Sequence, residues 1–254
     1  MKKLIAANPL PVVLFTVFVD MIGFGILIPV IPQLLANPGS EFYLLKVGDS
    51  VKHGYILLGY LTAIFPFMQF LATPILGELS DSFGRKKILA ISLFGTSISY
   101  ILFAVGIITK NIPLLFAARA FDGITGGNIA VAQAAIADVT EPQHRSRAFG
   151  LVGAAFGLGF IIGPYIGGKL SDPTIVPWFD ATTPFYFAAG LALLNAISVL
   201  TIFPETLKTR RELALKWNRA ILNIVRAYGL KPMRAIFATQ FLYQAGFSFF
   251  VTFF

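Results

Sequence analysis

The chain has 254 residues, of which 56% are hydrophobic and only 13% are charged, and its formal net charge is +8. A water-soluble domain of this length cannot hide so much apolar surface, because a folded sphere of this size leaves much of its area in contact with water. Lipid removes that difficulty, so the composition indicates an integral membrane protein. The absence of cysteine excludes disulfides and thiol chemistry.

Long apolar stretches recur along the chain, and each is long enough to cross a hydrocarbon layer of about 30 Å as a helix. The first follows Met1-Lys2-Lys3 and continues to about residue 36, which is too long for the core of a signal peptide. The sequence therefore predicts an all-α polytopic protein with six spanning helices and a partial seventh. The expected spans are 11–36, 54–76, 88–109, 112–137, 148–170 and 184–204, with a last segment from about 235.

Basic residues between the spans set the expected orientation in the membrane. With the N-terminus in the cytoplasm, fifteen Lys and Arg residues fall in cytoplasmic segments and four fall in the opposite ones. Topology therefore explains the positive charge, which does not indicate a nucleic-acid partner. We expect a multi-pass protein of the cytoplasmic (inner) membrane with its N-terminus inside.

The longest cytoplasmic connection carries its own pattern. Apolar residues from Trp217 to Tyr228 can share one helical face flanked by Arg219 and Arg226, which is typical of a helix on the membrane surface. A solvated basic loop is the alternative. Because the last apolar segment stops at Phe254 without a polar tail, we expect a truncated chain. The expected division is 1–204 for the six-helix domain, 205–234 for the linker and 235–254 for the start of a seventh helix.

One short pattern occurs twice. Gly77-Glu78-Leu79-Ser80-Asp81 ends the second span and Gly168-Lys169-Leu170-Ser171-Asp172 ends the fifth, each preceded by a proline, Pro74 or Pro164. The first copy is expected inside and the second outside, as in inverted repeats of spans one to three and four to six. A match of five residues can also arise by chance, so the repeated pattern is supporting evidence only.

Three ionisable residues, Asp20, Arg119 and Asp122, fall inside predicted spans, where each charge costs about 2.5–3.5 kcal/mol on insertion scales. The helical rise places both carboxylates near the midplane, so the three form a candidate proton or cation site. Arg119 and Asp122, at i and i+3, can instead be a structural pair. We expect Asp20 to be the protonated residue, because Arg119 should keep Asp122 ionised.

Polar residues also fall within the spans. Gln69, Asn128 and Gln133 are candidates for lining a cavity, and each is equally explained by a hydrogen bond between helices.

The loop after the second span reads GELSDSFGRKK, from Gly77 to Lys87. We expect Gly77 to let two helices pack closely and Gly84 to permit a tight turn with positive φ. Asp81 and Arg85 place paired charges at the membrane edge, where a partner helix end or a carboxylate can be held.

This loop resembles the signature loop of the major facilitator superfamily, G-x-L-x-D-x-x-G-R-K-K, in which Lys86 also takes part. Three more motifs follow in order, and PET at 204–206 ends the sixth span as is common in that superfamily. They are VDMIGFGILIPVIP (Val19–Pro32), similar to the first-helix motif of the drug:proton antiporter branch, RAFDGITGGN (Arg119–Asn128), similar to the fourth-helix R-x-x-x-G, and GFIIGPYIGG (Gly159–Gly168), similar to the fifth-helix antiporter motif.

The resemblance implies a secondary transporter that exports small organic molecules, drug-like or of tetracycline type, in exchange for protons by alternating access. It implies a proton gradient as the energy source, no other cofactor, the lipid bilayer as surroundings and a C-terminal six-helix half as partner. It also implies that Arg85 pairs with Asp138, at the end of span four, and that Asp81 faces an eleventh helix. Family members commonly carry a neutral residue near Asp122, which leaves its role open.

The fifth-helix motif has a physical explanation beside the resemblance. Its glycines, Gly159, Gly163, Gly167 and Gly168, remove side chains from a lipid-embedded helix, and Pro164 removes one helix hydrogen bond and favours a kink. A kinked and closely packed helix suits a hinge for rocking motions. A plain packing seam is the alternative.

Other functions have weaker support. A symporter or facilitator for sugars or metabolites shares the same fold, and a half-length membrane subunit without transport of its own is a third hypothesis. An enzyme is not expected, because no span carries a Ser/His/Asp set or H-E-x-x-H and the histidines, His53 and His144, fall in loops. Neither a phosphate-binding loop nor metal-ligand spacing occurs.

Overall fold

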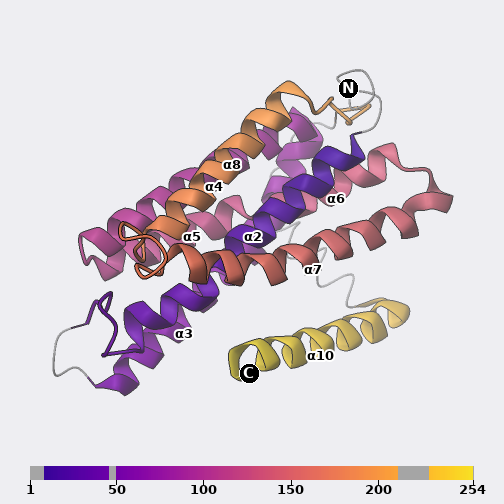
Figure 1. The fold of residues 1–254 in the computed structure, drawn as a ribbon. Coiled ribbons are helices and arrows are strands. Elements are labelled where there is room, and N and C mark those ends of the chain that lie inside the picture. Colours follow the sequence, from indigo (N-terminus) through magenta and orange to yellow (C-terminus); the bar gives the residue numbers. More distant parts are fainter. Residues whose placement is uncertain (1–8, 46–49, 211–228, 254) are drawn as a thin grey trace. The chain divides into compact units, whose positions relative to one another are not determined.

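The computed structural model describes residues 9–45, 50–210 and 229–253 (Figure 1). It divides into two units, Met1–Leu213 and Ala214–Phe254. Every regular element among the described residues is helical. In the first unit these are α2 (Leu10–Leu35), α3 (Val51–Phe83), α4 (Arg85–Ile108), α5 (Ile112–Thr125), α6 (Asn128–Val139), a 3₁₀ turn at Pro142–His144, α7 (Arg145–Leu170) and α8 (Thr183–Thr201); the second contains α10 (Lys231–Phe253).

Five elements of the described chain are long and apolar enough to cross a membrane: α2, α3, α4, the 3₁₀ turn with α7, and α8. They correspond to five of the six predicted spans. The predicted seventh segment falls within α10, and its role as a span stays a prediction. The predicted surface helix, at 217–228, lies outside the described residues.

The fourth predicted span is two helices rather than one. Asn111 caps α5 by accepting a hydrogen bond from the backbone N–H of Leu114, and α5 ends at Thr125. Gly126 and Gly127 separate it from α6, and neither half is long enough to cross a membrane alone. Glycine weakens a helix interior, which explains the break at this pair.

Close contact with α3 also requires glycine at the break. A Cβ on Gly127 would lie 3.2 Å from the backbone of Thr73, and one on Gly126 would lie 3.1 Å from the ring of Phe65. The sequence predicted a continuous span because hydropathy alone does not register a pair of glycines.

Helices α2 and α7 run in parallel and touch backbone to backbone. A Cβ on Gly159 would lie 2.8 Å from the carbonyl oxygen of Phe18, and one on Gly167 would lie 2.6 Å from that of Ile26. Without a hydrophobic driving force in lipid, such approach through small residues is a main source of helix association.

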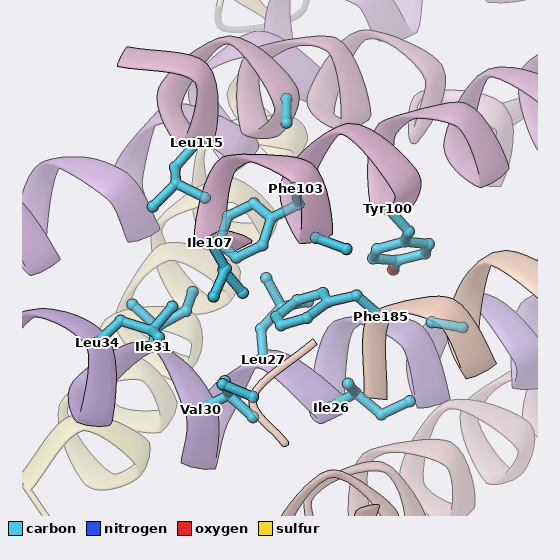
Figure 2. Close-up of a cluster of buried hydrophobic side chains, with 14 of the residues drawn as sticks. Ile26, Leu27, Val30, Ile31, Leu34, Tyr100, Phe103, Ile107, Leu115 and Phe185 are labelled. Carbon is cyan, nitrogen blue, oxygen red and sulfur yellow. The ribbon is translucent and has the colours of Figure 1, made fainter. Parts of the chain in front are cut away.

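Buried apolar side chains form two clusters, one toward each end of the first unit. The cluster where α2 begins includes Val13, Leu89 and Phe203. The cluster where α2 ends is drawn in Figure 2, in which Phe103 and Phe185 face each other with ring centroids 4.6 Å apart.

The outer surfaces of α3 and α7 are unlike those of α2 and α4. Most side chains of α2 and α4 are buried within the unit, whereas few of those of α3 and α7 are buried. Large apolar groups on these exposed faces include Tyr60 and Phe70 of α3 and Ile161 and Tyr165 of α7. The two faces need lipid or another apolar surface to cover them.

Candidate functional site

Asp20 of α2 meets Asn128 of α6 across the helix interface. The amide Nδ2 of Asn128 donates a hydrogen bond to Oδ2 of Asp20 over 3.0 Å. Asn128 is buried and is the first residue of α6, directly after the glycine break, whereas Asp20 is half-buried. The break therefore sets the position of the amide that holds the carboxylate.

Arg119 and Asp122 form an ion pair within α5, as their spacing predicted. Nη1 of Arg119 lies 2.5 Å from Oδ2 of Asp122, and each residue is only 3% exposed. The guanidinium also lies over the ring of Phe65, 4.4 Å from its centroid. Burial in lipid is tolerated because each charge neutralises the other.

A cavity of about 30 Å³ lies between Asp20 with its partner Asn128 and Asp122 of the ion pair. Asp20 and Asp122 both line it, so the structure brings together the two carboxylates predicted to share one depth. Gln69 and Asn128 line it too, whereas Gln133 does not, because its side chain is exposed on α6. The other residues of the wall are Met21, Phe24, Phe65, Thr96, Tyr100, Gly126 and Ile129.

Gln69 makes a hydrogen bond to another helix, which was one of the two explanations that the sequence offered, although its partner was not predicted. Its Nε2 donates to the carbonyl oxygen of Gly126 over 2.7 Å, while the N–H of Gly126 donates to the carbonyl of Asp122. Backbone groups freed by a broken helix in lipid need such partners. The polar residue in the middle of α3 and the Gly126-Gly127 pair were the available signals.

The signature loop forms a charged cluster at the end of the unit where α4 begins. Arg85 is 7% exposed, and its Nη2 lies 2.5 Å from Oδ1 of Asp81. Its Nε donates to Oδ2 of Asp138 over 3.1 Å, and its Nη1 donates to Oγ of Ser80. The pairing of Arg85 with Asp138, implied by the resemblance, is confirmed. Lys86 follows in α4 with a partly exposed side chain.

Glu205, beyond the end of α8, joins this cluster and was missed. Its Oε1 accepts hydrogen bonds from the backbone N–H groups of Arg85, over 2.9 Å, and Leu207, over 3.0 Å. It thus caps α4, which begins at Arg85, from a distant segment. The acidic residue of PET was the available signal.

Two glycines of the loop behave differently. Gly84 has φ +104°, as predicted for a tight turn, and a Cβ there would collide with the carboxylate of Glu205. The prediction for Gly77 was wrong, because a Cβ there would meet nothing within 4 Å.

The glycine motif of α7 is only partly a packing seam. Gly159, Gly163 and Gly167 face α2, and Pro164 contacts Gly25. Gly168 does not take part, since a Cβ there would meet nothing within 4 Å. Helical spacing accounts for the difference, because positions 159, 163 and 167 share one face and 168 is rotated away.

Residues 13–254 match the Major Facilitator Superfamily. The chain belongs to this superfamily. It is 37% identical over 238 residues to the class C tetracycline resistance protein of Escherichia coli, covering 93% of this chain and 55% of that protein. It is 32% identical over 254 residues to multidrug resistance protein 1 of Bacillus subtilis, covering 94% of this chain and 60% of that one.

A solved structure agrees with this assignment. The human organic anion transporter MFSD10 superposes with a TM-score of 0.67 at 26% identity, over 90% of this chain and 54% of that one. This major facilitator chain spans about half the length of the curated relatives it matches. It is a multi-pass membrane protein of a superfamily of transporters, which are not enzymes, so the expected family is confirmed.

Proposed function

We propose that this chain provides the N-terminal half of a proton-coupled exporter of small organic molecules, working by alternating access. Relatives that are 32–37% identical are named for resistance to tetracycline and to multiple drugs, which supports export of drug-like compounds. The motifs of the drug:proton antiporter branch, from Val19 to Pro32 and from Gly159 to Gly168, support exchange against protons.

The observation that carries the proposal is the pairing of Asp20 with a neutral amide inside the membrane. Asp122 has a guanidinium at 2.5 Å and would leave a buried cation behind if it lost its charge. Asp20 has no such cost, because Asn128 is uncharged and the carboxylate borders a cavity. A carboxylate that can be neutral or ionised at the midplane is a site where a proton can be taken up and released.

The remaining parts of the proposal concern surroundings and partners. The exporter acts in the cytoplasmic membrane with its N-terminus inside and draws its energy from the proton gradient, without a cofactor. The exposed apolar faces of α3 and α7 support a C-terminal six-helix half as the partner that closes the transport path.

The test is proton-driven efflux in everted membrane vesicles that carry the complete reading frame containing this chain. Asp20→Asn keeps the size and polarity of the side chain but cannot change its charge, so efflux falls to the level of vesicles without the protein. Asp172→Asn, in the exposed loop after α7, is the matched control and leaves efflux unchanged. Unaltered efflux by Asp20→Asn at normal abundance would remove Asp20 from the mechanism.

The same vesicles separate the competing functions. An exporter that exchanges substrate for protons moves protons out of the vesicles when substrate enters them, whereas a symporter moves protons in together with the substrate. A pH change in the vesicle lumen of the opposite sign would therefore indicate a symporter. The reading frame after residue 254 tests the third hypothesis, because a half-length subunit ends without a second six-helix half, whereas the proposed exporter continues into one.

A further inference from the structure

Among the residues that the structure describes, the amide of Asn128 is hydrogen-bonded through its NH₂ end only. We propose that Asn128 is a positioning residue for Asp20 that holds the side chain in both protonation states, by turning its amide. The inference rests on the proposed function, in which Asp20 gains and loses the proton, and it assigns to Asn128 the task of keeping that group in place throughout the cycle.

The arrangement in the structure is the one that suits an ionised Asp20. Nδ2 of Asn128 donates to Oδ2 of Asp20 over 3.0 Å, at an ordinary hydrogen-bond length. A carboxylate only accepts hydrogen bonds, so the NH₂ end of the amide is the end it requires. Asn128 itself is only 1% exposed, so its amide is held within the helix interface.

The other end of the amide supplies what a protonated Asp20 would need. Oδ1 of Asn128 is fully buried and has no hydrogen-bond partner among the described residues. A carboxylic acid donates one O–H, and the amide oxygen accepts it once the amide has turned by about 180° about χ2. The χ2 torsion of asparagine is broad and roughly two-fold, and the turn exchanges two groups of nearly equal size.

The backbone that carries Asn128 is held while its amide turns. Gly126 and Gly127 precede it, and Gln69 of α3 holds the break through the carbonyl oxygen of Gly126, over 2.7 Å. Rotation about χ2 therefore changes the hydrogen bond to Asp20 without moving α6 against α2.

Other ionisable groups near Asp20 are few. Asp122, paired with Arg119, lines the same cavity from α5, and Tyr100 lines it from α4. Among the described residues that line it, those of α3 and α6 are neutral. The ionisable side chains of α7 and α8, which also pack on α2, lie near the helix ends.

The experiment is the pH profile of efflux in vesicles carrying the complete reading frame. Asn128→Leu keeps a similar volume but removes both the donor and the acceptor of the amide. The hydrogen bond to the ionised carboxylate is the stronger of the two, so the variant favours the neutral acid and moves the half-maximal pH upward by about one unit. Asn195→Leu is the matched control. Asn195 is equally buried and accepts a hydrogen bond from Thr16, one turn before Asp20 on α2, over 3.1 Å. Its loss leaves the half-maximal pH in place.

The outcomes separate the two proposals. An unchanged half-maximal pH in Asn128→Leu, with Asp20→Asn inactive, overturns the role of Asn128 and leaves the exporter intact. Normal proton-driven efflux by Asp20→Asn defeats the proposed function itself. If Asn128→Leu does not accumulate in the membrane, Asn128→Asp keeps the shape but replaces the donor by a second carboxyl. It moves the half-maximal pH upward by like-charge repulsion, and a wild-type profile overturns the proposal.

Discussion

The two copies of the G-x-L-S-D pattern lie at opposite ends of the domain, and what surrounds them differs. In both, the serine hydroxyl donates to the glycine carbonyl three residues earlier, over 2.7 Å from Ser80 to Gly77 and 3.1 Å from Ser171 to Gly168. The two ends share this hydrogen bond, as expected for inverted repeats, although α3 continues to Phe83 and α7 has already ended at Leu170.

The aspartates that follow have different partners. Asp81 pairs with Arg85 in the cluster that also contains Asp138 and is capped by Glu205. Asp172 accepts hydrogen bonds from the hydroxyl and backbone N–H of Thr174, which hold the pKa of this exposed carboxyl below its usual value. One repeated pattern thus gives a network across distant segments at one end and a local turn at the other.

The largest difference in stability between the two ends is expected when the basic residue of each is replaced. Arg85→Ala leaves two carboxylates without a guanidinium and lowers the free energy of unfolding by about 2–3 kcal/mol, the scale of lost charged hydrogen bonds. Lys169→Ala, in the exposed last turn of α7, changes it by less than about 0.5 kcal/mol. Thermal unfolding in one detergent checks both, and equal effects would contradict the contrast.

A smaller difference is expected from the glycines. Gly84→Ala places a Cβ at φ +104° and against the carboxylate of Glu205, which costs about 1–2 kcal/mol of stability. Gly168→Ala meets no neighbour in a helical turn and raises stability by up to about 1 kcal/mol. The two shifts in melting temperature should have opposite signs, and a loss at Gly168 would indicate an unrecognised packing role.

The smallest difference in stability is expected when the serine of each copy is replaced. Ser80→Ala removes the acceptor of Nη1 of Arg85 as well as the bond to Gly77, for about 1 kcal/mol. Ser171→Ala removes only the local bond and costs a few tenths of a kcal/mol. The same unfolding measurement resolves them, and a larger effect at Ser171 would reverse the comparison.

Local features of the site followed from the sequence. The spacing of Arg119 and Asp122 predicted their ion pair, and the glycine at position 84 predicted the turn. The pairing of Arg85 with Asp138 needed the family resemblance, because nothing in either residue's own neighbourhood specifies the other.

Contacts between distant segments did not follow. Gln69 meets Gly126, Asn128 meets Asp20, and Glu205 meets the backbone of Arg85 across 57, 108 and 120 positions. Such contacts depend on which helix faces turn toward each other, and helical spacing gives a face without naming its neighbour. A glycine likewise shows where a side chain is missing, but it does not show which neighbouring segment packs closely against that position.

The broken fourth span decides on which side of the membrane the later segments lie. Counting the long apolar helices of the described chain gives five crossings before residue 205, an odd number. An odd number would separate the start of α2 from the end of α8, yet Val13 and Phe203 belong to one buried cluster. The pair α5 and α6 restores even parity. A topology that omits the crossing by α5 and α6 would therefore place a reporter enzyme fused after Thr201 on the wrong side of the membrane.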